Sequence, residues 1–137
     1  MSRPAYGDFV EAARVDGLYP SRSRADATVR RVLAEFGRQV TGPERVALAG
    51  ALPREAAVAF VSDVPHRQPR TGAEFVEDLA ARSSGATAAT ARWDAGTVLT
   101  ALARTVPDDV MDDVLARLPT GYALLFGRAE LAPRAAA

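Results

Sequence analysis

Residues 25–40 read Ala25-Asp-Ala-Thr-Val-Arg-Arg-Val-Leu-Ala-Glu-Phe-Gly-Arg-Gln-Val40, and their apolar side chains recur at steps of three and four. Such spacing places side chains on one stripe of a helix, because an α-helix turns once in 3.6 residues. The stripe returns at residues 91–106. We therefore expect two long central helices, over 22–39 and 87–105. The stripes consist of Ala25, Val29, Val32, Leu33, Phe36 and Val40, and of Ala91, Ala95, Val98, Leu99, Leu102 and Val106.

The same offset of 66 residues relates the whole chain to itself without a gap. Between residues 9–60 and 75–126, twelve of 52 paired positions are identical, and most of them are large apolar residues or a Leu-Pro pair. These residue types set packing and turns, so the pattern predicts an internal duplication. Matching segments include Phe9-Val10-Glu11 with Phe75-Val76-Glu77, Leu52-Pro53 with Leu118-Pro119, and Phe60 with Phe126.

Each repeat is predicted to hold about four helices. A short amphipathic helix precedes the long helix in each repeat. In the first repeat this short helix is predicted to end at Gly17. In the second it is predicted to begin at Thr71-Gly-Ala-Glu74, which has the spacing of a capping box. A third helix begins at Thr41-Gly-Pro-Glu44, again with that spacing, and its counterpart begins near residue 107. Both end at a Leu-Pro pair, because the residue before proline avoids the helical region. A half-length helix then closes each repeat.

The predicted fold class is all-α, because no segment alternates apolar and polar residues over the length of a strand. Each half has only about sixty residues, a size at which stability is marginal, so we expect one compact helical domain over 1–137 rather than two independent ones. Its predicted parts are repeat one at 5–63, a proline-containing connector at 64–70, repeat two at 71–127 and a frayed tail at 128–137.

A distinctive order of helix starts and core residues runs through most of the chain. It comprises Phe9-Val10-Glu11, Val32-Leu33-Ala-Glu-Phe36, Thr41-Gly-Pro-Glu44, Leu52-Pro53, Phe75-Val76-Glu77, Val98-Leu99 and Leu118-Pro-Thr-Gly-Tyr-Ala-Leu-Leu-Phe126. In this order the chain resembles, over residues 5–127, the bacterial family known as domain of unknown function 2267. The resemblance implies a small, soluble, all-helical, internally duplicated protein. It supplies no catalytic residues, because the family has no established activity.

Composition narrows the possible functions. The chain has no cysteine, which excludes disulfides, thiolate zinc sites and cysteine nucleophiles. Seventeen basic and seventeen acidic residues give a formal net charge of zero, so no overall field attracts nucleic acid or anionic membrane. No apolar run suits a signal peptide or a membrane span, and we expect a cytoplasmic protein.

Four aspartates form the candidate metal site. At steps of four on a helix, two carboxylate pairs would lie on adjacent strips and could hold a hard divalent cation. The paired positions of the first repeat carry no acid, so the feature is specific to the second. Acids in a first helical turn are also favoured by the helix dipole, and a solvated acidic face is the preferred interpretation. The residues are Asp108, Asp109, Asp112 and Asp113.

Three single residues are weighed for a specific role in function or packing. His66, the only histidine, has Asp63 near it as an orienting carboxylate, but a loop histidine between prolines is more often exposed to solvent. Trp93, the only tryptophan, could line a ligand pocket, and the preferred interpretation places it at the edge of the core. Gly96 is interpreted as a point where a neighbouring helix approaches closely.

The arginines of the first long helix are interleaved with acids. Asp26 precedes Arg30 by four residues and Glu35 follows Arg31 by four, which predicts ion pairs on the helix surface. The third helix carries only one acid and one arginine, so it lacks the basic face of a DNA-reading helix. A nucleic-acid partner is therefore disfavoured.

No nucleophile-elbow motif or glycine-rich phosphate loop is present, and no cofactor is expected. The sequence best fits a non-enzymatic interaction or scaffold module that binds another protein or a second copy of itself. A divalent-metal enzyme or sensor using the aspartates at 108–113 is the alternative, and a nucleic-acid binder is the second alternative.

Overall fold

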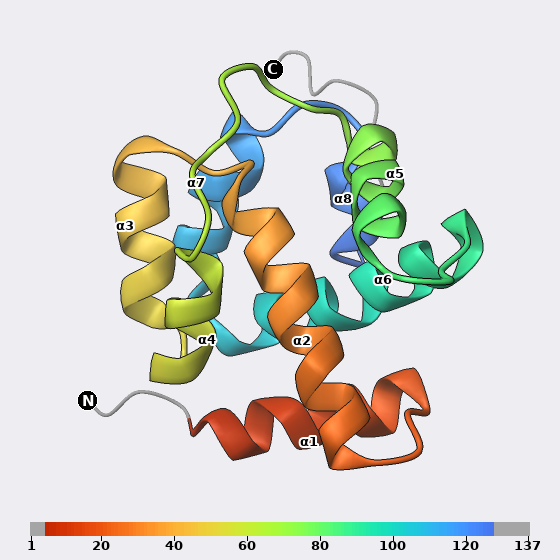
Figure 1. The fold of residues 1–137 in the computed structure, drawn as a ribbon. Helices are drawn as coiled ribbons and strands as arrows, with labels where there is room; N and C mark the ends of the chain where they lie inside the picture. Colours follow the sequence, from red (N-terminus) through yellow and green to blue (C-terminus); the bar gives the residue numbers. More distant parts are fainter. Residues whose placement is uncertain (1–4, 128–137) are drawn as a thin grey trace.

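The structure is a computed structural model that describes residues 5–127 of the 137-residue chain. The described part is all-α and contains no strand, as predicted (Figure 1). The frayed tail predicted at 128–137 lies outside the described residues. The helices are α1 (Tyr6–Gly17), α2 (Arg22–Gly37), α3 (Gly42–Ala51), α4 (Arg54–Phe60), α5 (Gly72–Arg82), α6 (Ala88–Thr105), α7 (Asp108–Arg117) and α8 (Tyr122–Leu125).

The two predicted long helices are confirmed as α2 and α6, with α2 ending two residues earlier than expected. α3 and α7 both stop directly before a Leu-Pro pair, and the leucine at each stop has extended backbone angles. α1 ends at Gly17 as predicted, although the left-handed residue that follows is Leu18, with φ of 58°. Gly17 is required for another reason: a Cβ there would lie 2.3 Å from the ring of Tyr19.

Side-chain caps fix the starts of three of the eight described helices, α2, α5 and α6. Ser21 Oγ accepts a hydrogen bond from the backbone N–H of Arg24 at 3.1 Å, and Thr87 caps α6 in the same way. The Thr71 capping box is confirmed, because Thr71 and Glu74 each bond the other's backbone N–H. The capping box predicted at Thr41 is wrong: its side chain makes no cap hydrogen bond. Gly42 follows it with φ of 68°, so the first turn of α3 begins outside helical geometry.

Replacing Thr71 with alanine is expected to lower the free energy of unfolding by about 1 kcal/mol, because the N–H of Glu74 loses its acceptor. Thr41→Ala is the matched control, since Thr41 occupies the same helix position without a cap bond. Urea unfolding of both variants measures the difference. Equal losses from the two substitutions would show that the cap bond contributes nothing.

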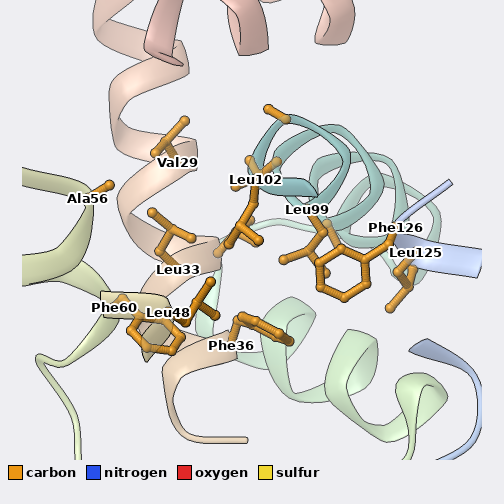
Figure 2. Packing of buried hydrophobic residues seen from close by; sticks show 14 of the residues in the cluster. Val29, Leu33, Phe36, Leu48, Ala56, Phe60, Leu99, Leu102, Leu125 and Phe126 are labelled. Carbon is orange, nitrogen blue, oxygen red and sulfur yellow. The ribbon is translucent and has the colours of Figure 1, made fainter. Parts of the chain in front are cut away.

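α2 is the centre of the packing, and it contacts α1, α4, α5 and α6. Each of the eight helices contributes a buried residue to one hydrophobic cluster. In Figure 2, Leu33 and Phe36 of α2 point toward Leu99 and Leu102 of α6, so the two predicted stripes meet in the core. The core thus joins the first four helices to the last four.

Candidate functional site

A buried carboxylate lies at the last turn of α2. The side chain of Glu35 is 1% exposed. Its Oε1 accepts a hydrogen bond from Arg82 Nη1 at 3.0 Å, and its Oε2 lies 3.4 Å from His66 Nε2. The predicted surface ion pair of Glu35 with Arg31 is therefore wrong. The Glu35 side chain is buried and contacts Arg82 of α5 and His66 of the 64–70 connector instead. The same Arg82 atom donates to Asp63 Oδ2 at 3.1 Å.

The connector is held against the C-terminal end of α2. The backbone N–H of His66 donates to the carbonyl of Arg38 at 2.8 Å, and Arg38 Nε donates to the carbonyl of Val64 at 3.1 Å. These bonds hold the imidazole beside Glu35, and the side chain of His66 is only 22% exposed. The preferred interpretation of His66 as a solvent-exposed loop residue is thus wrong. Asp63 faces Arg82, and the carboxylate nearest the imidazole is Glu35.

A second carboxylate completes the group. The ligand-forming atoms of Glu35, His66 and Asp78 all lie within 4.8 Å of one another. Asp78 is oriented by Arg70, which donates two hydrogen bonds to it at 2.9 and 3.0 Å. We call Glu35, His66, Asp78 and the two arginines that hold the carboxylates, Arg70 and Arg82, the Glu35 cluster. An imidazole and two carboxylates are ligand types that zinc accepts in proteins.

The hydroxyl of Tyr122 lies among these charges. Tyr122 is 1% exposed, and its hydroxyl has no hydrogen-bond partner among the described residues. Burial raises the pKa of Tyr122 well above its ordinary value, and the negative charges of Asp78 and Glu35 raise it further. The phenol is therefore a neutral O–H group near two carboxylates. Sequence reasoning missed Asp78 and Tyr122, because neither stands in a local motif.

A groove of about 590 Å³ follows the outer face of α6. A second hollow of about 400 Å³ continues it toward α5 and shares four residues with it. Two large apolar side chains are exposed here: Trp93 is 51% exposed and Leu124 is 55% exposed. We call this surface the α6 groove and define it by Glu77, Arg92, Trp93, Gly96, Leu124 and Leu125.

Trp93 also fastens α6 to the end of α1. Its indole N–H donates to the carbonyl of Gly17 at 3.0 Å, and the neighbouring Asp94 accepts from the hydroxyl of Tyr19 at 2.6 Å. Trp93 therefore lies at the edge of the packing while one side of it lines the groove. The predicted close approach of a neighbouring helix at Gly96 is wrong within the described chain, because nothing beyond the adjacent backbone of α6 lies within 4 Å of where its Cβ would be.

The four predicted metal-binding aspartates lie on α7. Asp108, Asp109, Asp112 and Asp113 are all exposed. Within residues 5–127, the only group of at least three potential ligands that converges is Glu35, His66 and Asp78. The metal site at 108–113 stays a prediction.

Comparisons with known proteins identify the family. No helix of the described residues is long and apolar enough to cross a membrane. No curated protein matches the chain. A family model described as "Uncharacterized conserved protein (DUF2267)" matches residues 6–125. Because this match covers most of the sequence, the chain belongs to that family.

Proposed function

We propose that this protein is a non-enzymatic interaction module of the cytoplasm, built from two tandem helical repeats, that pairs with a second copy of itself through the α6 groove. The observation that carries the proposal is an exposed apolar groove lined by charges of both signs. Nucleic acid is not the proposed partner, because the formal net charge is zero.

The order of helices supports the two-repeat architecture. α1, α2 and α3 begin at residues 6, 22 and 42, and α5, α6 and α7 begin at 72, 88 and 108. Each start is displaced by the 66 residues that also relate the identical sequence positions. The two long helices differ in their surroundings, because α2 lies at the centre of the packing whereas α6 lines the groove.

The surface of the groove suits a helix from another molecule. Trp93 and Leu124 expose apolar area that a partner would remove from water, which is the main favourable term in association. Gly96 lines the same groove, and nothing beyond the adjacent backbone of α6 lies within 4 Å of where its Cβ would be. A second helix can therefore approach the backbone of α6 closely at this point.

The charges of the groove favour a second copy as the occupant. Arg92 and Glu77, which carry opposite charges, both line it, and Glu77 also lies within electrostatic reach of Arg70. Arg104, at the other end, already pairs with Asp16 at 2.8 Å. In a two-fold dimer the same patch meets itself, so Arg92 of one copy can face Glu77 of the other. The groove is thus complementary to itself in charge.

Sedimentation equilibrium over a wide range of protein concentration tests the proposal. Wild type is expected to show a reversible dimer, and Leu124→Arg to stay monomeric because a charge replaces exposed apolar area in the groove. Val58→Arg is the matched control, because Val58 is 60% exposed and lies on α4. It should dimerise like wild type.

A charge exchange tests the proposed register. Arg92→Glu alone should weaken the dimer by repulsion from Glu77, and Arg92→Glu combined with Glu77→Arg should restore it. A wild-type protein that is monomeric at every concentration would contradict the proposal. Equal effects of Leu124→Arg and Val58→Arg would contradict the assignment to this groove.

A further inference from the structure

We propose that the Glu35 cluster is a zinc site, in which Glu35, His66 and Asp78 are the ligands. The site lies at the junction of α2, α5 and the connector, and it is separate from the α6 groove. It does not depend on self-association. It differs also from the exposed aspartates of α7 in residues, burial and donor atoms.

The set of donor atoms selects the metal. Calcium and magnesium prefer sites made of oxygen ligands. Zinc binds imidazole nitrogen and carboxylate oxygen in the same site, and its sites commonly take three protein ligands with a fourth position left for water. One nitrogen from His66 and oxygens from Glu35 and Asp78 match that pattern. The cluster is therefore assigned to zinc among the common divalent cations.

The separation of the donor atoms fits a tetrahedral ion. His66 Nε2 and Glu35 Oε2 are 3.4 Å apart, which is longer than the usual N–H···O hydrogen bond. Bonds of about 2.0–2.1 Å to a tetrahedral zinc place two ligand atoms about 3.4 Å apart. The third donor, on Asp78, is within 4.8 Å of both.

The surrounding charges orient the ligands and match a divalent ion. Arg82 bonds Oε1 of Glu35 and leaves Oε2 facing the imidazole, while Arg70 fixes the carboxylate of Asp78. Such partners behind the ligands set their direction in metal sites. Asp63 and Glu74 also lie beside the two arginines, at 3.1 and 3.9 Å. Among these six groups the carboxylates outnumber the guanidinium groups by two, which favours a cation.

The buried hydroxyl of Tyr122 supports the assignment. Buried hydroxyls are nearly always hydrogen-bonded, because leaving one without a partner costs free energy. The Tyr122 hydroxyl has no partner among the described residues although it is fully buried near Asp78 and Glu35. A water molecule in the fourth position of zinc would provide one.

Calorimetric titration of the full chain with zinc chloride, after treatment with a chelator, tests the site. We expect one zinc ion per chain, and a Co²⁺-loaded sample with the strong visible absorption of four-coordinate cobalt. His66→Ala should weaken zinc binding by about 100-fold or more, since a ligand is lost. Because His66 is partly exposed, this variant should keep the fold, which circular dichroism verifies. Asp78→Asn provides a second variant with the same expectation.

Asp109→Ala combined with Asp113→Ala is the matched control and should bind zinc like wild type. The absence of stoichiometric zinc binding by wild type would overturn the assignment. So would a His66→Ala variant with unchanged affinity. If only the α7 double variant loses zinc, the metal binds the exposed aspartates and the assignment to the Glu35 cluster is wrong.

Discussion

Replacing Phe36 with alanine is expected to lower the free energy of unfolding by about 4 kcal/mol. The ring is fully buried, and its centroid lies 5.5–6.2 Å from those of four other aromatic rings, on α4, α5, α8 and the residue after α8. Alanine would remove this apolar area and leave a cavity between both halves of the chain. A domain of this size is stable by about 5–15 kcal/mol, so the loss is a large part of the total.

Phe36→Leu is the matched control. The residue 66 positions later is Leu102, which is also fully buried, so a leucine side chain is accepted at the equivalent sequence position. Most of the apolar area is kept, and the expected loss is only about 1–1.5 kcal/mol. Urea unfolding followed by circular dichroism measures both variants. Similar small losses for alanine and leucine would show that the aromatic contacts are not the centre of the core.

The helices and the core were predictable because their signals are local. An apolar stripe such as that of residues 25–40 indicates directly which side of the helix is buried. The Leu-Pro pairs end α3 and α7 because the residue before a proline avoids the helical region. The Thr41 capping box failed although its residues suit the motif. Its failure depends on the φ of Gly42, and a residue pattern does not specify that angle.

The candidate site was not predictable from spacing, because its residues meet only in the folded chain. Glu35 and His66 are 31 residues apart, and Asp78 comes from a third segment. One signal was present in the sequence: the 66-residue offset pairs Glu35 with Ala101, which is 3% exposed. A charge whose counterpart at this offset is apolar indicates a buried polar contact. The aspartates of α7 have regular spacing, but regular spacing does not bring ligands together around an ion.

Replacing Gly37 with alanine is expected to cost about 3 kcal/mol of unfolding free energy, although the substitution adds one methyl group to a helix. A Cβ at Gly37 would lie 1.7 Å from the backbone carbonyl oxygen of Phe60, and the position of that Cβ is fixed by the backbone of Gly37. Neither can rotate away, so the end of α2 must move from α4. That movement would also displace Phe36 and Glu35, which immediately precede Gly37.

Gly96→Ala is the matched control, because it makes the same change inside α6 where nothing lies within 4 Å of the new Cβ. Alanine is the better helix former, so this variant should gain about 0.5–1 kcal/mol. Urea unfolding at low protein concentration compares both with wild type. The sequence alone suggests the opposite for Gly37, since its paired position in α6 is Ala103. If Gly37→Ala is as stable as wild type, the close approach of α2 to the end of α4 is wrong.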